Sequence, residues 1–488
     1  MSISSALNNA TTGLSAASKR ADIVSSNIAN ALTPGYSKRD LSVSERILGS
    51  EGAGVIVNGV VRASDAALTR EKRAAEGSVA RDGVVSAALT NLNEALGETD
   101  DPFSLFTQYQ NFETSLRNLS QTPESGSMQA QVLDNAKALV TTFNQLSKKT
   151  QTERESADGE IARQVDIVNS ALKQIESLNA DIAKGNAGQR DVSALLDQRK
   201  TLIDQVSSII PVRELVRDSG AVDLVTSEGV FLIEGTAREV SFTQSSVITA
   251  DMEYDGGAGA LSGVSVDGVD ITPGGNGVFA LRQGSLAGLF EVRDEIAPDF
   301  QAKIDALAAD VMQRFEGIDL TLAPGDPGLF TDAGAAYDVS QEVGLAGRIA
   351  LNAAVDPDQG GEVWRLRDGL GAAAEGAAGA STFINSMLDV LSEQRFISAG
   401  AGVTGASTAS EAVAAVFSLV GSARVTADSS LASSSARAQA AGDAEAAVMG
   451  VDTDQEMQTL LLVERAYAAN ARVIQTAQAM IDTLMELL

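Results

Sequence analysis

Residues 3–28 read ISSALNNATTGLSAASKRADIVSSNI, and the expected fold is built outward from this stretch. Its apolar side chains recur at alternating steps of four and three residues, which is the spacing of a coiled-coil seam. The seam positions are Ile3, Leu7, Ala10, Leu14, Ala17, Ala21, Val24 and Ile28. The pattern stops at Thr33-Pro34-Gly35-Tyr36, where Pro-Gly suits the central positions of a type II turn. The stretch therefore predicts one long amphipathic helix.

The other end of the chain carries a second seam of the same kind. Its positions are Leu460, Val463, Tyr467, Asn470, Ile474, Ala477, Ile481, Leu484 and Leu488. Asn470 is its polar member, and such a residue often fixes the register of a coiled coil. Another apolar stripe follows Ala466, Ala469, Val473, Met480, Leu484 and Leu487. A helix that is apolar on two faces needs more than one partner, and two seams at opposite ends of one chain favour pairing with each other.

Composition excludes several classes of function. The 488 residues include 36 Lys and Arg, 65 Asp and Glu, and no Cys or His, so the net charge is −29. Without Cys or His the chain has no thiol nucleophile, no Ser-His-Asp triad, no zinc finger and no disulfide. The negative charge argues against binding to nucleic acid. No apolar run is long enough to span a membrane, and the N-terminus lacks the apolar region of a cleaved signal peptide.

The residues between the two seams alternate between helical and β-like patterns. Residues 49–68 favour a hairpin that turns at Asn58-Gly59. Helix is expected over 79–208, ending before Pro211, and β-branched runs between Gly-rich turns follow over 212–283. Further helices are expected over 285–316, 381–395 and 410–488 with a break at Gly450, and one strand at Arg348 to Leu351.

This order predicts a mainly α fold with β insertions (α+β), in an elongated molecule with a long helical bundle. Residues 1–35 and 452–488 would form a terminal coiled-coil tail domain. One apolar seam is too small to offset the entropy of ordering so many residues, so we expect these tails to be disordered in the monomer. The remaining expected domains are a helical bundle (36–211, 284–318 and 380–451), a β-rich outer domain (212–283) and a loop-rich insertion (319–379).

Candidate chemical sites are weak. Asp356, Asp358 and Gly361 resemble the start of a Ca²⁺ loop, but the closing acid would fall on Arg367, so we interpret this stretch as a solvated turn. Acids in the first helical turn after Gly450 are explained by the helix dipole. We expect no catalytic residue, cofactor or metal. The alternative from another class is an acidic extracellular enzyme, such as a carbohydrate hydrolase, with 212–283 as its working domain.

Two terminal motifs resemble a known family. The segments from Ala29 to Tyr36, ANALTPGY, and from Glu464 to Thr476, ERAYAANARVIQT, are similar to the terminal signatures of bacterial flagellar rod, hook and hook-associated proteins. Three internal stretches are similar to the members that join hook to filament. These stretches are Gly59 to Arg62 with Asp65 and Leu68, Leu195 to Arg199 (LLDQR), and Gly284 to Asp294 (GSLAGLFEVRD).

The resemblance implies a structural, non-enzymatic role as an adaptor ring at the hook–filament junction. Implied partners are copies of the chain in a ring, the hook protein, the next hook-associated junction protein and an export chaperone at the C-terminal region, with no nucleic acid and no membrane. Export would use the flagellar type III channel. Hook protein and flagellin remain alternatives. The expected subunit-interface residues are Ile3, Leu7, Leu14, Val24, Ile28, Leu460, Val463, Tyr467, Asn470, Ile474, Ile481 and Leu484.

Overall fold

The computed structural model describes residues 3–48, 51–256, 259–275 and 277–486. Most of these residues are helical, and the sheets are small, with antiparallel strand pairs. The mainly α fold with β insertions is therefore confirmed. The chain divides into two compact units: unit 1 is Met1–Val79, Asp166–Val240 and Ser434–Leu488, and unit 2 is Ala80–Val165 and Ser241–Ser433. Their boundary falls inside the expected β-rich segment 212–283, after Val240.

Unit 1 contains both terminal helices, a hairpin and a four-stranded sheet in the order β3-β4-β5-β6. Parts of α2 (Ala66–Leu96), α4 (Gly126–Ala187) and α10 (Ala409–Met449) belong to it as well. Its other elements are α1 (Ile3–Ala29), β1 (Arg39–Leu48), β2 (Glu51–Arg62), α5 (Ser193–Ile209), β3 (Val212–Val216), β4 (Val222–Thr226), β5 (Phe231–Glu234), β6 (Thr236–Ala237) and α11 (Thr453–Glu486).

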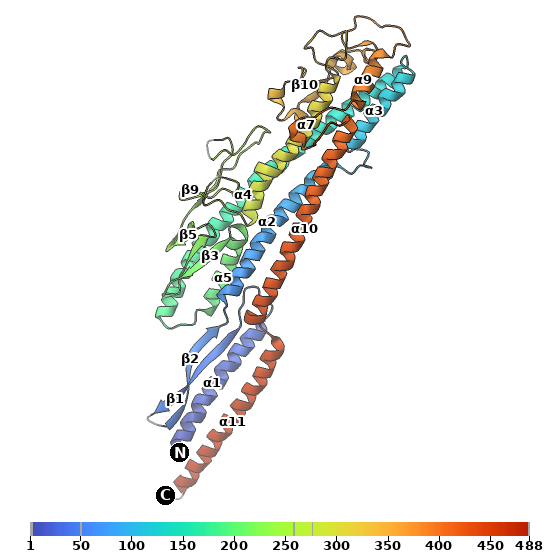
Figure 1. The fold of residues 1–488 in the computed structure, drawn as a ribbon. Helices are drawn as coiled ribbons and strands as arrows, with labels where there is room; N and C mark the ends of the chain where they lie inside the picture. Colours follow the sequence, from blue (N-terminus) through green and yellow to red (C-terminus); the bar gives the residue numbers. More distant parts are fainter. Residues whose placement is uncertain (1–2, 49–50, 257–258, 276, 487–488) are drawn as a thin grey trace. The chain divides into compact units, whose positions relative to one another are not determined.

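The hairpin β1–β2 lies beside α1 (Figure 1), and it corrects the expected turn at Asn58-Gly59. These two residues lie inside β2, because Ser42 pairs with Gly59 while Val43 pairs with Val57. Asn58 is therefore the extra residue of a β-bulge, and Gly59 has φ +146°, which other residues rarely adopt. A Gly-containing pair between two apolar runs marks a bulge as readily as a turn.

Two asparagines of α4 attach strand residues to the helix. The amide of Asn179 donates to the carbonyl of Val222 at 2.8 Å and accepts from its N–H at 3.1 Å. Asn169 makes the same pair of bonds with Val240, at 2.8 and 2.9 Å. Each asparagine thus satisfies both backbone groups of one strand residue, which fixes the position of the strands along α4.

Unit 2 is built around α7 (Ala297–Phe315), which is buried along most of its length. A π-helical turn (Val292–Ile296) joins α7 to α6 (Ser285–Glu291). The unit also holds α3 (Leu105–Gln121), α8 (Arg365–Asp368), α9 (Thr382–Ser392), β8 (Ser265–Val266), β9 (Val269–Asp270), β10 (Phe330–Asp332) and β11 (Ile349–Leu351), besides parts of α2, α4 and α10. Strand β7 (Val240–Ser241) spans the boundary. β11 confirms the strand expected at Arg348 to Leu351.

The core of unit 2 combines an aromatic cluster with buried ionic groups. The rings of Phe112, Phe315 and Phe330 lie with centroids 5.3–5.9 Å apart in tilted or edge-on arrangements. Arg293 and Asp158 form a fully buried ion pair at 2.7 Å. Arg314 pairs with Asp310 at 2.7 Å and donates to the carbonyls of three later residues, Val390, Glu393 and Ser407. This arginine therefore holds the chain after α9 against α7.

Asp305 is a buried carboxylate of α7 that forms no ion pair with a cation among the described residues. It accepts from the backbone N–H of Gly344 and of Ala346, both at 2.7 Å, and from the amide of Gln301 at 2.8 Å. Burial raises the pKa of Asp305 to about 6 against the opposing effect of these hydrogen bonds. A carboxyl whose pKa is higher in the folded state stabilises most when it is protonated, so its contribution is lost as the pH rises through about 6.

We expect the Asp305→Asn variant to remove a pH dependence from unit 2. The pKa difference corresponds to about 3 kcal/mol of unfolding free energy lost by the native chain between pH 4 and 7. The fluorescence of Trp364, the single Trp of the chain, follows urea unfolding of this unit. Asp299→Asn changes an exposed carboxylate on the same helix. The unfolding free energy of this variant should depend on pH as steeply as that of the native protein. Equal slopes in all three proteins would contradict the assignment.

Candidate assembly interface

Helices α1 and α11 lie side by side and run in opposite directions (Figure 1). The end of α1 meets the start of α11, where the amide of Asn27 donates to Glu456 at 3.1 Å. Further along, a Cβ at Gly13 would lie 2.9 Å from the amide nitrogen of Asn470. The missing side chain at Gly13 thus makes room for Asn470, and the two contacts together set the register of the pair.

The structure places the expected interface residues in three groups. Val24 and Val463 are buried, and Tyr467, Ile481 and Leu484 are exposed. The half-buried group comprises Ile3, Leu7, Leu14, Ile28, Leu460, Asn470 and Ile474. The buried positions of α11 are Glu456, Val463 and Ala477, which with Asn470 recur every seven residues. This seam packs on α1 of the same chain, so its centre is an intramolecular contact. Leu487 and Leu488 lie outside the described residues.

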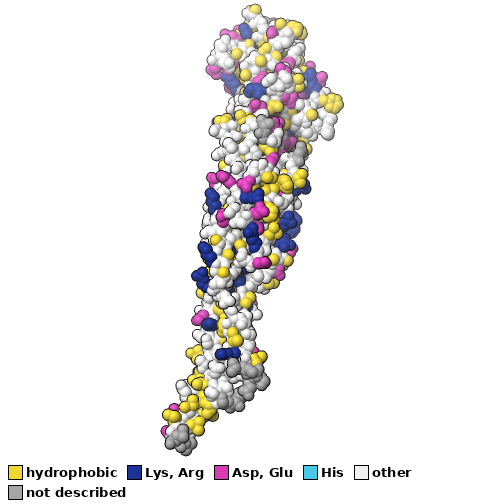
Figure 2. All heavy atoms as spheres, turned by 90° about the vertical axis from the view of Figure 1, so that its left-hand side faces the viewer, with side chains coloured by type: hydrophobic (Ala, Val, Ile, Leu, Met, Phe, Trp, Pro, Cys, Tyr) yellow, Lys and Arg dark blue, Asp and Glu magenta, His cyan; other side chains and the backbone are white. Residues whose placement is uncertain are grey.

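Several apolar side chains of α11 outside this seam are uncovered within the described chain. Leu462 is 64% exposed and Met485 is 72% exposed, and Leu461, Val473 and Met480 are open as well. Figure 2 shows hydrophobic side chains gathered toward the C-terminal end of this helix. Exposed apolar side chains gathered on one helix mark a surface for association with another protein.

A cluster of polar residues at the base of the two tails holds them together. The amide of Asn27, which is fully buried, donates to the carbonyl of Arg39 at 2.8 Å and accepts from the N–H of Arg39 at 3.1 Å and the hydroxyl of Tyr36 at 2.9 Å. Lys38 pairs with the buried Glu456 at 3.2 Å. All the polar atoms of Asn27 are thereby satisfied, and α1, the segment after it and α11 are joined at one residue.

The turn expected at Thr33-Pro34-Gly35-Tyr36 is present. The N–H of Tyr36 donates to the carbonyl of Thr33 at 3.2 Å, and Gly35 has φ +79°, as a type II turn requires. A Cβ at Gly35 would lie 2.3 Å from the hydroxyl of Thr201 on α5. Glycine is thus needed both for the turn and for its close approach to α5, and the turn delivers Tyr36 to Asn27.

Asp197 of α5 holds both strands of the hairpin. It accepts from Arg39 of β1 at 2.8 Å and from Arg62 of β2 at 2.6 Å. The three side chains are largely buried, so the carboxylate compensates two guanidinium groups that are shielded from water. This contact explains why Arg62 and the Leu195 to Arg199 stretch occur together in the sequence.

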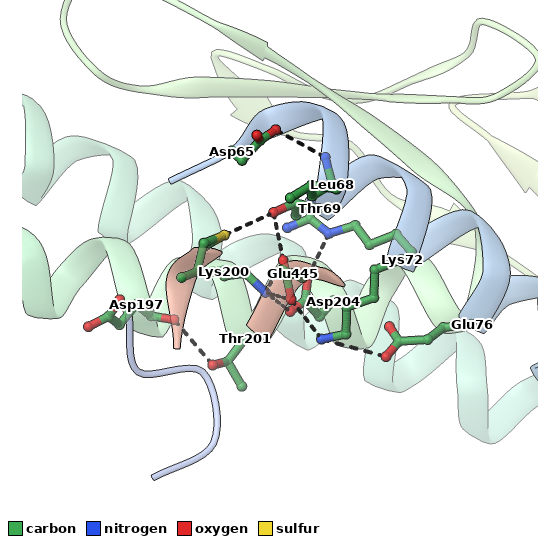
Figure 3. Close-up of polar contacts among 12 residues, drawn as sticks. Asp65, Leu68, Thr69, Lys72, Glu76, Asp197, Lys200, Thr201, Asp204 and Glu445 are labelled. Atoms are coloured by element: carbon green, nitrogen blue, oxygen red, sulfur yellow. Dashed lines mark hydrogen bonds and ion pairs between the residues drawn. The ribbon is translucent and has the colours of Figure 1, made fainter. Parts of the chain in front are cut away.

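A second ionic cluster holds the end of α10 against α2 and α5 (Figure 3). Glu445 accepts from the hydroxyl of Thr69 at 2.7 Å and pairs with Lys72 at 3.1 Å and with Lys200 at 3.2 Å. Burial alone would raise the pKa of Glu445, but the hydroxyl and the two ammonium groups lower it overall. Asp204 binds Lys200 at 2.8 Å from the same helix. The end of α10, from which α11 continues, is therefore fixed by charge.

Sequence reasoning missed Asn27, Asp197 and Glu456. Glu456 was interpreted through the helix dipole, yet it is buried. The available signal was its position in the seam, seven residues before Val463. The solvated turn expected at Asp356 was wrong for that residue: Asp356 is buried and binds Lys137 at 2.6 Å. Across the described ranges, no group of three or more acidic side chains is placed to hold a metal ion, and no helix has the length and hydropathy needed to cross a membrane.

We expect Asp197→Ala to destabilise unit 1 strongly. The change leaves Arg39 and Arg62 without their carboxylate in a largely buried site, and such a loss costs about 3–5 kcal/mol. Calorimetry should show the unfolding transition of unit 1 moving to a lower temperature. The urea midpoint of the Trp364 fluorescence, which reports on unit 2, should stay unchanged. Asp218→Ala removes an exposed carboxylate of the same unit and should match the native protein. A native-like transition in Asp197→Ala would show that the hairpin is held by other contacts.

Comparison with known protein families gives three matches along the chain. The model described as the flagellar hook-associated protein FlgK helical domain matches residues 89–323. The flagella basal body rod protein model matches residues 7–36, which contain most of α1 and the turn after it. The model of the flagellar basal body rod FlgEFG protein C-terminal region matches residues 447–487, which contain α11.

Individual relatives agree with these matches. Flagellar hook-associated protein 1 of Escherichia coli (strain K12) is 26% identical over 99% of this chain and 100% of its own length. The Bacillus subtilis (strain 168) protein of that name is 28% identical over 61% of each chain, and the Salmonella typhimurium one is 30% identical over 50% of this chain and 45% of its own.

Among solved structures, the flagellar hook junction protein FlgK from Burkholderia pseudomallei gives a TM-score of 0.43 at 22% identity, covering 54% of this chain and 46% of its own. The family assignment rests on the matched models and on the E. coli relative, which aligns along almost the whole chain. The chain belongs to the FlgK family of flagellar hook-associated proteins and is a structural protein of the hook junction.

Proposed function

We propose that this protein forms an adaptor ring between hook and filament and performs no catalysis. The observation that carries the proposal is the set of apolar side chains of α11 that one chain leaves exposed, although α1 covers the seam of that helix. Apolar surface removed from water drives association. If copies are arranged around an axis, the tails of neighbouring copies would cover these exposed side chains. The packed tails would then form a continuous helical inner wall of the ring.

The tails would gain order during this assembly. Within one chain, α1 fully buries only four of its described residues, Ala10, Ala17, Val24 and Asn27, and two of these are alanines. Such small buried side chains offset little of the entropy lost by ordering the helix. We propose that residues 1–35 and 452–488 are disordered in the isolated monomer and are ordered by contact with neighbouring copies.

The remaining partners follow from the position of such a ring. Its two faces would contact the hook protein and the next hook-associated junction protein. Before assembly, an export chaperone that binds the C-terminal region would cover the apolar face of α11. Export through the flagellar type III channel, without a cleaved signal, would place the protein outside the cell in the flagellum.

Charge placed on the apolar side chains of α11 should block incorporation. We expect Leu462→Asp, at an exposed position, and Ile474→Asp, at a half-buried position of the seam, to be absent from purified flagella while the circular dichroism of each monomer stays near native. A carboxylate buried without a partner in the assembled tails costs several kcal/mol. Quantitative immunoblotting of flagella from cells that carry each variant measures incorporation.

Gln478→Asp is the matched control, because it adds the same charge to α11 at an exposed polar position. It should incorporate normally. Normal incorporation of Leu462→Asp would show that the exposed apolar side chains of α11 do not form an interface. Equal failure of all three variants would show that the charge of the tail, rather than apolar contact, decides assembly.

Deletion of the gene should leave rod and hook intact and prevent filament growth. Hook and filament subunits differ, so without an adaptor the filament has no complementary surface on which to start. Electron microscopy should show hooks without filaments, and immunoblotting should show unpolymerised flagellin in the medium. Full-length filaments would refute the adaptor role, and absent hooks would indicate a rod or hook protein.

A further inference from the structure

A cavity of about 300 Å³ in unit 1 concentrates positive charge. It lies where β2 ends and α2 begins, next to α5 and β3. Six cationic side chains line it: Arg62, Arg70, Arg73, Arg199, Lys200 and Arg213. The lining carboxylates are Asp65 and Glu214. This excess of cations is opposite to the net charge of −29 on the whole chain, and it needs a physical explanation.

The guanidinium of Arg73 has one donor group without an acceptor. Arg73 is 5% exposed, and it donates through Nε to Asp204 at 2.6 Å and through Nη1 to Glu214 at 2.5 Å. Its Nη2 is buried and has no acceptor in the described part of the chain. Arg62 repeats this arrangement: its Nε binds Asp197, and its buried Nη2 has no acceptor among the same residues. Buried donors in folded proteins normally have a partner.

Two further arginines at the cavity form no ion pair with a carboxylate in the described part of the chain. Arg199 donates to the side-chain oxygen of Asn179 at 2.9 Å and to the carbonyl of Gly220 at 2.8 Å, which are neutral groups. Burial lowers the pKa of Arg199 against the nearby charge of Glu214, and the charge of Arg62 acts in the same direction as burial. Arg70 is exposed and makes no hydrogen bond or ion pair within the described ranges. An anion entering the cavity would meet a free guanidinium at its edge and unmatched ones behind it.

We propose that this cavity receives a carboxylate side chain from a second copy of the chain. A carboxylate accepts two parallel N–H bonds from a guanidinium, and such charge-assisted pairs are the strong ones. A neighbouring copy is a strongly acidic molecule, so charge complementarity favours it as the occupant. The inference rests on the proposed ring, because the ring places copies next to one another.

Zero-length cross-linking of purified flagella tests the inference. The Arg70→Lys variant keeps the charge and supplies an amine, which a carbodiimide condenses with a contacting carboxylate to form an amide. We expect a covalent dimer of this chain that the native protein does not give, and mass spectrometry then identifies the acidic residue. Arg190→Lys is the matched control, an exposed arginine of the same unit outside the cavity, and should give no new dimer.

Charge reversal gives a second measurement. Arg70→Glu should lower the amount of the protein in flagella at least about tenfold, since like charges at an interface repel, while Arg190→Glu should incorporate normally. Circular dichroism of both monomers should be native. Normal incorporation of Arg70→Glu, or cross-linking of Arg70→Lys only to a different protein, would overturn the inference.

The outcomes also separate this inference from the proposed ring. Native protein present in flagella, with no new dimer from Arg70→Lys, refutes the carboxylate contact and leaves the ring intact. Native protein absent from flagella refutes both. If inorganic phosphate raises the melting temperature of the native monomer but not that of Arg70→Glu, and no dimer forms, the cavity binds a free oxyanion and the second-copy occupant is wrong.

Discussion

The contact between Asn27 and Glu456 is the constraint on which the rest of unit 1 depends, because it joins residues 429 positions apart in the chain. Everything between them has to leave the tail base and return to it. The hairpin, α5 and the end of α10 are fixed around that point by Asp197 and Glu445. Two buried carboxylates thus position the point at which α11 starts, and the register with α1 follows from Gly13 and Asn470.

Sequence periodicity was sufficient for the helices and for the pairing of the two ends, because a seven-residue repeat survives in any antiparallel pair. It was insufficient at Asn58-Gly59, where local residue preference cannot separate a bulge from a turn. It was also insufficient at Asp356 and Glu456, since burial of an acid depends on a cation or amide supplied from elsewhere in the chain. Lys137 and Asn27 lie hundreds of residues away from these acids, and no local pattern records that.

The motifs that resemble the family prove to be contact sets within one chain. Tyr36 bonds Asn27, Arg62 bonds Asp197, Ser285 bonds Gln164, and Arg293 pairs with Asp158. These four signatures therefore stabilise the fold of the subunit. The expected interface residues divide accordingly: Val24 and Val463 serve the α1–α11 pair, whereas Tyr467, Ile481 and Leu484 remain available to a neighbour. A heptad seam identifies a packing face, and only the structure shows whether the same chain already covers it.

Net charge and the open apolar face act over different distances. A charge of −29 makes two free copies repel each other at long range, and salt shortens that range to about 10 Å. Apolar contact acts only when surfaces touch. An acidic chain with an uncovered helix face can therefore stay dispersed in solution, yet associate once another structure holds its copies side by side. In that setting the contacts to the template would already have overcome the repulsion, and burial of the exposed apolar side chains of α11 would add its full contribution.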